Sequence, residues 1–260
     1  MNTAGLFDIA GKSALVAGAS GSFGTVAARA LAGAGCNLTL AAGKAEALGA
    51  IAAECEALGV PVSTVNRRPQ DEASANAIVA AAIEAHDALD ILVVASGMNA
   101  VAAIEDMAPD TFSAVMDANV TQSWLLARAA TGPMKAQGSG KIVLVSSARG
   151  LLGHPAGYTA YCASKAAVDG ITKALGCELG RTGITVNAIA PTVFRSPITE
   201  WMFADDERAK GVREGFLARV PKGRLGEAED LAGPLLFLAS KASDFYTGHI
   251  LYADGGYTAG

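Results

Sequence analysis

Tyr161 and Lys165 stand four residues apart at the start of an alanine-rich segment, 161–179, that predicts a helix. Residues four apart lie on one face of a helix, so the phenol and the ammonium group project the same way. A free tyrosine has a pKa of about 10, and a cation held beside the ring favours the phenolate and lowers that pKa. We therefore expect Tyr161 to give or take a proton at working pH.

A hydroxyl group can reach the same place, because an apolar strand predicted from residue 141 ends in Ser146 and Ser147. A hydroxyl, a phenol with an adjustable pKa and an ammonium group together suit the interconversion of an alcohol and a carbonyl, with hydride supplied by a cofactor. The Tyr-x-x-x-Lys spacing also occurs by chance in many helices, where the tyrosine covers the core and the lysine is solvated. The elements around the pair must decide between the two interpretations.

The composition excludes several classes of protein. With 260 residues, 51% of them hydrophobic and 17% charged, the chain is globular and long enough for one large α/β domain or two small ones. A net charge of −5 gives no reason to expect nucleic acid or an anionic membrane as a partner. No apolar run reaches the length of about 18 residues that a membrane span needs. The histidines are scattered, so we expect no metal site.

The cysteines show neither C-x-x-C pairing nor metal-ligand spacing; they are Cys36, Cys55, Cys162 and Cys177. We interpret them as small buried residues of a protein in a reducing compartment. Residues 1–12 lack a basic region followed by an apolar run, which argues against a secretion signal. We expect the protein to work in the cytoplasm.

Short apolar stretches alternate with helix-forming ones about six times along the chain. The strands are predicted at 13–17, 37–41, 62–65, 90–95, 141–146, 185–190 and 250–252, and the helices at 25–34, 44–58, 71–85, 110–135, 161–179 and 228–239. Because the strands are apolar throughout, this alternation predicts an α/β fold with a parallel sheet covered by helices on both faces. No repeat or linker interrupts it, so we expect one domain.

Ligands of such sheets bind outside the carboxyl ends of the strands, where Gly18, Gly97, Ser147 and Pro191 all fall. Gly18 opens a glycine-rich turn between a strand and a helix, an arrangement that can receive a pyrophosphate on backbone N–H groups, although tight turns need glycine anyway. The alternation stops from residue 193 to 220, where a polar segment with aromatic residues predicts either a lid over the site or an immobile surface hairpin.

In order along nearly the whole chain, these motifs resemble those of the short-chain dehydrogenase/reductase family. The matching segments are 14–18 with Gly24, 90–93, Asn119, 146–147, Tyr161 with Lys165, 186–191, 223–224, 237–240, 247–248 and 254–256. Segments 6–8 and 240–245 are similar to the branch that contains gluconate 5-dehydrogenase. The resemblance implies a doubly wound, Rossmann-like sheet in one dinucleotide-binding and catalytic domain, 1–260, with a substrate lid at about 193–220.

The resemblance also implies an NAD(P)-dependent oxidoreductase that interconverts a secondary alcohol and a ketone. Tyr161 would be the general acid in reduction and the base in oxidation, and Lys165 would lower its pKa and hold the nicotinamide ribose. Ser147 would hydrogen-bond the substrate oxygen, with Ser146 as a rival. Asn119 would hold a water that links Lys165 to solvent, unless its amide is satisfied locally within the helix.

Positions that the family uses for NAD(P) fall on Gly18, Ser20, Ser22, Phe23, Gly24, Lys44, Arg68, Ser96, Gly97, Tyr161, Lys165, Pro191, Val193 and Ser196. The chain departs from the family pattern in this half, at Ala17, Ser22, Val94, Ala95 and Arg68. An acid at the end of the second strand would bind the ribose of NAD and repel the 2′-phosphate of NADP, but segment 41–44 has none. Lys44, Arg67 and Arg68 could bind that phosphate, so we favour NADP over NAD, although Lys44 could equally be an ordinary surface lysine.

The substrate candidates follow from their positions, and they are Met98, Arg149, His154, Tyr158, Arg195 and Trp201. Arg149 or Arg195, if it faces inward, could pair bidentately with a carboxylate, but either could equally be a surface arginine. A polyol, a sugar acid and a cyclic ketone all remain possible as substrates.

One alternative is a nucleotide-binding or regulatory protein of the same fold with little catalysis. The resemblance implies a homotetramer that packs through the long helices around Asn119 and Tyr161 and through the C-terminal segment 254–260.

Overall fold

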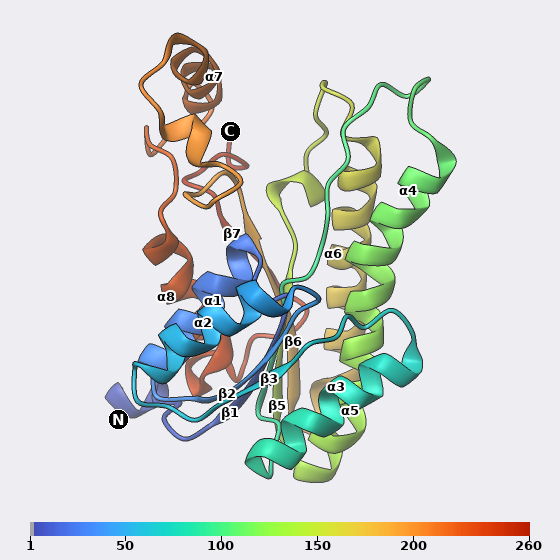
Figure 1. Cartoon of the computed structure of the whole chain (residues 1–260), viewed down its shortest axis with the longest axis vertical. Coiled ribbons are helices and arrows are strands. Elements are labelled where there is room, and N and C mark those ends of the chain that lie inside the picture. The colour runs from blue at the N-terminus through green and yellow to red at the C-terminus, as the bar shows by residue number, and fades with distance from the viewer. Residues whose placement is uncertain (1–2) are drawn as a thin grey trace.

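Seven parallel strands form one sheet in the computed structural model, which describes residues 3–260. The order across the sheet is β3-β2-β1-β4-β5-β6-β7 (Figure 1). The strands are β1 (Ser13–Ala17), β2 (Asn37–Ala41), β3 (Val62–Val65), β4 (Ile91–Val94), β5 (Gly140–Val145), β6 (Ile184–Pro191) and β7 (Ile250–Ala253). This is the doubly wound, Rossmann-like parallel sheet that the sequence predicts.

Helices cover both faces of this sheet (Figure 1). One face carries α1 (Ser22–Gly33), α2 (Ala45–Glu56) and α8 (Ala228–Ala239), and the other carries α3 (Glu72–His86), α5 (Gln122–Gln137) and α6 (Thr159–Leu179). Short 3-10 turns lie at η1 (Ala4–Leu6), η3 (Ala148–Gly150), η4 (Gly180–Thr182), η5 (Glu200–Phe203) and η6 (Lys241–Ser243). Within residues 3–260, no helix is both long enough and apolar enough to cross a membrane.

The strands are apolar throughout because both of their faces are buried. In β1, Ala14 and Val16 pack into the core under α1, α2 and α8, whereas Leu15 packs into the core under α3, α5 and α6. Ile91 and Leu92 in β4 divide between the two cores in the same way. Successive side chains of a strand point to opposite faces, so continuous hydrophobicity is what a sheet buried on both sides requires.

The strand order reverses between β1 and β4, and this reversal opens a crevice at the carboxyl ends of the strands. Ala17 pairs with Val94 on one side and with Ala41 on the other, so the loops after three strands start side by side. Gly18 has a φ of +79°, and a Cβ at this position would overlap the backbone of Ser96. Glycine therefore lets the first loop turn directly against the loop that follows β4.

The single long helix predicted at 110–135 is wrong in its detail. Two helices, α4 (Pro109–Met116) and α5, are joined by a π-helical turn, η2 (Asp117–Thr121). The turn carries Asn119, and π turns inside α-helices often mark functional positions. Apolar periodicity does not reveal such a turn, because the helix continues on both sides of it.

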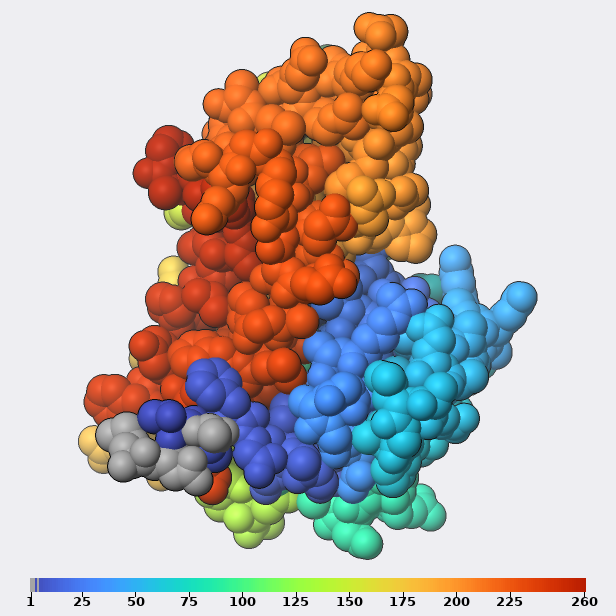
Figure 2. All heavy atoms as spheres, turned by 90° about the vertical axis from the view of Figure 1, so that its left-hand side faces the viewer, coloured from blue at the N-terminus to red at the C-terminus, as the bar shows by residue number. Residues whose placement is uncertain are grey.

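The segment from 193 to 220 stands beyond the carboxyl edge of the sheet, with α7 (Glu207–Leu217) at its far end (Figure 1). Figure 2 shows this segment in orange above the blue residues of α1. Its base is anchored, because Val220 belongs to a small core with Ala148 and Tyr257.

Candidate active site

Helix α6 places Tyr161 and Lys165 in its first turns, on the same side. The Nζ atom of Lys165 lies 5.6 Å from the centroid of the Tyr161 ring. Lys165 is only 5% exposed, and its Nζ donates a hydrogen bond of 2.7 Å to the carbonyl oxygen of Val145. The two side chains that the sequence pairs are therefore side by side in the structure.

The pKa values of the pair differ from the expectation. Burial raises the pKa of the Tyr161 phenol, and a hydrogen bond with Ser147 opposes the rise only in part. Burial also lowers the pKa of Lys165 to about 8, although the carboxylate of Asp169 opposes it. The lowered tyrosine pKa expected from the sequence is thus wrong for the protein alone: loss of solvation outweighs the hydrogen bond from Ser147 and the charge of Arg149. The ammonium group of Lys165 is directed at a backbone carbonyl instead.

Ser147 follows β5 and stands at the start of η3, where its Oγ accepts a 3.2 Å hydrogen bond from the N–H of Arg149. Ser147 also donates to the carbonyl oxygen of Pro191 at 3.4 Å, and its hydroxyl is the one that hydrogen-bonds Tyr161. The rival, Ser146, is 1% exposed and donates to the carbonyl of Lys165 at 3.4 Å. Ser146 therefore hydrogen-bonds the backbone of α6, and Ser147 is the serine that lies beside the phenol.

Asn119 ties three segments together. Its Nδ2 donates to the carbonyl oxygen of Met98 at 2.9 Å and to Oγ of Ser164 at 2.8 Å, and its Oδ1 accepts from the N–H of Met98 at 2.7 Å. A Cβ at Gly97 would lie 2.7 Å from this Oδ1 and 3.8 Å from Nζ of Lys165. The partners belong to other segments, so the interpretation of Asn119 as a locally satisfied helix amide is wrong.

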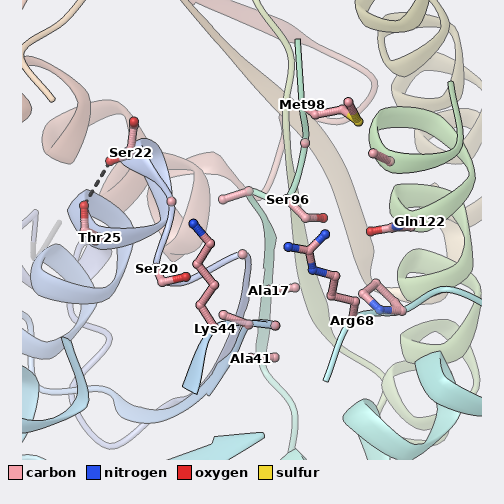
Figure 3. Close-up of a pocket in the computed structure, with 18 of the residues that line it drawn as sticks. Ala17, Ser20, Ser22, Thr25, Ala41, Lys44, Arg68, Ser96, Met98 and Gln122 are labelled. Carbon is pink, nitrogen blue, oxygen red and sulfur yellow. Dashed lines mark hydrogen bonds between the residues drawn. The ribbon is translucent and has the colours of Figure 1, made fainter. Parts of the chain in front are cut away.

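A cavity of about 450 Å³ occupies the crevice between the loops that follow β1, β2, β3 and β4 (Figure 3). Eight of the residues predicted for cofactor or substrate binding line it, namely Gly18, Ser20, Ser22, Lys44, Arg68, Ser96, Gly97 and Met98. Ala17 and Ala95, two of the departures from the family pattern, also line it, whereas Val94 is buried in the core. The cavity thus has the place and size expected of a ligand site in such a sheet.

Two predicted cofactor residues have packing positions instead. Phe23 is 5% exposed and packs in the core beneath α1 and α8. A Cβ at Gly24 would overlap the carbonyl group of Gly18, so glycine there lets α1 approach the first loop. Neither Phe23 nor Gly24 lines the cavity.

Positive charge gathers at one end of the cavity. Lys44, Arg67 and Arg68 line it at the ends of β2 and β3, and no acidic residue lines it within the described part of the chain. The Arg68 side chain crosses the face of Gly43, where a Cβ would lie 2.9 Å from its Cγ and 3.1 Å from its Cδ. Figure 3 shows both Lys44 and Arg68 reaching into the cavity.

Two further features suit a polar ligand there. Helix α1 begins after Gly21, which offers no side-chain cap, so its first N–H groups are open to an anion. The hydroxyl of Ser96 is buried in the cavity wall without a hydrogen-bond partner. Buried hydroxyls are nearly always paired in proteins, so a ligand bound here would satisfy this one.

The predicted cofactor residues after β6 lie outside this cavity. Pro191 is buried at the end of the strand, and Val193 is half-buried. Ser196 shares a 2.9 Å hydrogen bond with Thr199. Pro197 and Ile198 line the cavity instead, together with Thr25, Pro69 and Gln122. None of these five was predicted, because no motif in the sequence marks their positions.

Three substrate candidates gather beside Tyr161. Tyr158 packs edge-on against it, with ring centroids 6.3 Å apart, and His154 lies 4.4 Å from Tyr158. Arg149 donates from Nη1 to the carbonyl of Gly153 at 2.8 Å. Burial lowers the pKa of His154, and the charge of Arg149 lowers it further.

The remaining two candidates point elsewhere. Arg195 forms ion pairs with Glu200 at 2.7 Å and with Glu227 at 3.0 Å, so the inward-facing role considered for it is not supported. Trp201 is 45% exposed and packs under the guanidinium of Arg208, 5.4 Å from its ring centroid. Among the described residues, no three His, Cys, Asp or Glu side chains come together to hold a metal ion.

A family model described as enoyl-(acyl carrier protein) reductase matches residues 18–258 of the chain. An uncharacterized oxidoreductase of Mycobacterium tuberculosis is 51% identical over 255 residues, which cover 97% of this chain and 93% of the relative. Gluconate 5-dehydrogenase of Gluconobacter oxydans is 34% identical over 253 residues, which cover 97% of each protein.

Among solved structures, a gluconate 5-dehydrogenase from Burkholderia cenocepacia in complex with NADP and tartrate superposes with a TM-score of 0.90. It is 30% identical, and the match covers 98% of each chain. These similarities extend over nearly the whole chain and include the loops at the carboxyl edge of the sheet.

Proposed function

Since this chain belongs to the short-chain dehydrogenase/reductase family, we propose that it interconverts a secondary alcohol and a ketone with NAD(P). The observation that carries the proposal is that the Ser147 hydroxyl hydrogen-bonds Tyr161 while Nζ of Lys165 lies 5.6 Å from the centroid of the same ring. Gly97, which lines the cavity at the sheet reversal, lies close to this Nζ. A polyol, a sugar acid or a cyclic ketone would suit such a site.

In the proposed mechanism, Tyr161 donates its proton to the substrate oxygen in reduction and takes one from the alcohol in oxidation. Ser147 donates a hydrogen bond to the same oxygen, where negative charge develops. Lys165 keeps a positive charge beside the phenol at neutral pH, because its pKa of about 8 lies above 7. The nicotinamide supplies or accepts the hydride when bound.

Asn119 would act through Lys165. Its amide binds Met98 and Ser164, and the adjacent Gly97 lies close to both Oδ1 of Asn119 and Nζ of Lys165. This proximity supports a role for Asn119 in holding a water that passes protons from Lys165 towards solvent. Lys165 would also hold the ribose hydroxyls of the cofactor.

The residues of the cavity fit a dinucleotide. Gly18 and Gly21 leave the first loop without side chains that would block a pyrophosphate, and the open start of α1 offers N–H donors to it. Ser96 has a free hydroxyl, and Ser22 sits at the first position of the helix. Val193 and Ser196 would contact the nicotinamide end after β6.

NADP is the cofactor that the charges favour. A 2′-phosphate adds negative charge at the end of β2, where Lys44 and Arg68 line the cavity and no acid opposes them. Neither cation forms an ion pair with a carboxylate within residues 3–260, so both charges are free for a phosphate. NAD would leave them without a partner.

The segment 193–220 is proposed as a lid over the substrate. Pro197 and Ile198 contact the cavity, and Ile198 is 75% exposed, so a bound ligand could bury it. Val220 and the C-terminal end of α7, at Phe216 and Leu217, pack in a small core, so movement would be confined to the part of the segment before them.

A homotetramer in the cytoplasm completes the proposal. Helix α5 leaves Trp124 45% exposed, and α4 leaves Phe112 36% exposed, so this side offers apolar surface to another copy. The cysteines are all unbridged, which is what a reducing compartment favours.

The replacement Tyr161→Phe tests the function directly. It removes only the hydroxyl, so turnover of ketones with NADPH should fall by about three orders of magnitude. Nicotinamide absorbance measures this turnover. NADPH affinity, measured by fluorescence titration, should stay near the wild-type value. Unchanged turnover would rule the mechanism out, and failure of wild type to bind NADPH or NADH would favour a non-catalytic role instead.

A further inference from the structure

Three arginines near the carboxyl edge of the sheet differ in their partners. Arg195 is neutralised by Glu200 and Glu227. Within residues 3–260, neither Arg149 nor Arg219 forms an ion pair with a carboxylate. Cations without a carboxylate partner are available to an anion from outside the protein.

Both of these guanidinium groups pack against the ring of Tyr257. The Cζ atom of Arg149 lies 5.3 Å from the ring centroid and that of Arg219 lies 4.5 Å from it. Tyr257 is 2% exposed and stacks on Phe216 at 5.2 Å. A ring of this kind attracts both cations and favours positions beside its face.

The hydroxyl of Tyr257 fixes Arg149 further. It accepts a hydrogen bond of 2.8 Å from Nη2 of Arg149, while Nη1 donates to Gly153. A guanidinium has five N–H donors, so these two bonds orient the group and leave donors for a ligand. This contact joins residues 108 positions apart, so no local sequence pattern announces it.

The oriented arginine belongs to the substrate side of the site. The backbone N–H of Arg149 donates a hydrogen bond of 3.2 Å to Oγ of Ser147. Burial raises the pKa of Tyr161, and the charge of Arg149 is among the groups that oppose the rise. Burial lowers the pKa of His154, and both Arg149 and Arg219 lower it further. The charge of Arg149 therefore acts on both Tyr161 and His154, and that of Arg219 acts on His154.

We propose that Arg149, oriented by Tyr257, and Arg219 bind an anionic group on the substrate, so that this enzyme acts on anionic alcohols or ketones. The inference rests on the proposed function for the reaction itself. The anion has two possible sources: the carboxylate of a hydroxy or keto acid, or a phosphate of a coenzyme A thioester. A planar guanidinium fork pairs bidentately with either.

Matched substrates test the proposal. A keto sugar acid, the neutral ketose of the same chain length and acetoacetyl-coenzyme A are compared by kcat/KM with NADPH. Wild type should prefer an anionic substrate over the neutral one. In Arg149→Met that preference should fall by roughly tenfold or more, with a smaller fall in Arg219→Met.

Two more variants separate binding from folding. Tyr257→Phe removes one hydrogen bond and should reduce the preference by several-fold, which a purely structural role would not do. Arg149→Lys keeps the charge and should recover part of the preference if Arg149→Met is poorly folded. Arg29→Met is the control, because Arg29 pairs with Glu54 at 2.7 Å on the outer surface of α1 and α2, and its preference should equal that of wild type.

A titration with tartrate, followed by calorimetry, separates this inference from the proposed function because it needs no turnover. Tartrate should bind wild type at least tenfold more tightly than Arg149→Met. Preference for the keto sugar acid identifies a carboxylate, and preference for the thioester identifies a phosphate. Equal handling of neutral and anionic substrates by wild type, or an unchanged preference and unchanged tartrate affinity in Arg149→Met, would overturn the proposal.

Discussion

Lys165 donates a 2.7 Å hydrogen bond from Nζ to the carbonyl oxygen of Val145, the last residue of β5. The sheet therefore holds the ammonium group directly, through an acceptor whose position the strand pairing fixes. Val94 of β4 pairs with Leu144 of β5, and Val145 pairs with Ile189 of β6. A group held in this way keeps its place, although burial makes its charge costly.

Because the buried charge of Lys165 destabilises the folded protein, we predict that stability depends on pH. Burial lowers the pKa of Lys165 from 10.5 to about 8 in the folded protein. Between these two values the unfolded chain binds the proton and the folded chain does not, so stability rises with pH, by at most about 1.4 kcal/mol per pH unit. Conversely, this stability is lost as pH falls from 10.5 to the folded pKa of about 8, below which both states hold the proton.

Denaturant melts of wild type and Lys165→Met between pH 7.5 and 10 measure this effect. The difference in the free energy of unfolding between the two proteins should change with pH in favour of wild type as pH rises. The same slope for both proteins would show that Lys165 does not titrate in this range.

Gly97→Ala should damage the site without disturbing the cofactor cavity as a whole. The new Cβ would lie 2.7 Å from Oδ1 of Asn119, which three hydrogen bonds hold in place. We expect a loss of stability of about 1–3 kcal/mol and at least a tenfold loss of kcat.

Gly49→Ala is the matched control for that variant. Gly49 lies in the middle of α2, and a Cβ there meets nothing within 4 Å. Alanine should raise the free energy of unfolding by about 0.5–1 kcal/mol and leave kcat unchanged. A Gly97→Ala protein that behaved like this control would mean that Asn119 can move aside.

Arg68→Ala should weaken NADPH binding and spare NADH. Removing a free cation beside the 2′-phosphate should raise the Kd of NADPH by roughly tenfold, while the Kd of NADH should change less than twofold. Fluorescence titrations of wild type, Arg68→Ala and Lys44→Ala give both constants. An equal rise in the Kd of both cofactors would mean that Arg68 contacts the adenine, or only packs over Gly43, and does not bind the 2′-phosphate.

Light scattering checks the assembly. Wild type should have four times the mass of the 26.2 kDa chain. Trp124→Glu places a charge on the exposed apolar side of α5 and should shift the mass to smaller species, with the far-ultraviolet circular dichroism unchanged. A monomeric wild type would contradict the proposed homotetramer.

Periodicity predicted the sheet well, because each strand had to be apolar on both faces. The strands 13–17, 37–41 and 62–65 and the helix 228–239 have the predicted bounds. The same logic placed Gly18, Gly97, Ser147 and Pro191 at one edge, since the carboxyl ends of parallel strands meet there.

Sequence patterns carry no information about contacts between distant residues. Tyr257 reaches Arg149 across 108 positions, and Arg68 lies over Gly43 because β3 and β2 pair in one register. The pKa of Tyr161 depends on how much solvent the fold removes, and spacing within a helix carries no information about that. The sequence contains the two glutamates that pair with Arg195, but it does not show that their side chains point towards it.

The π-helical turn Asp117–Thr121 contains more residues than an α-helical turn of the same height. Each residue of an α-helix rotates the chain by about 100°, so deleting one residue here would let α4 run straight into α5. Phe112 and its neighbours would then face another direction although their own order had not changed. Such a deletion would rotate every side chain of α4 relative to α5, and the amide of Asn119 would no longer reach Met98.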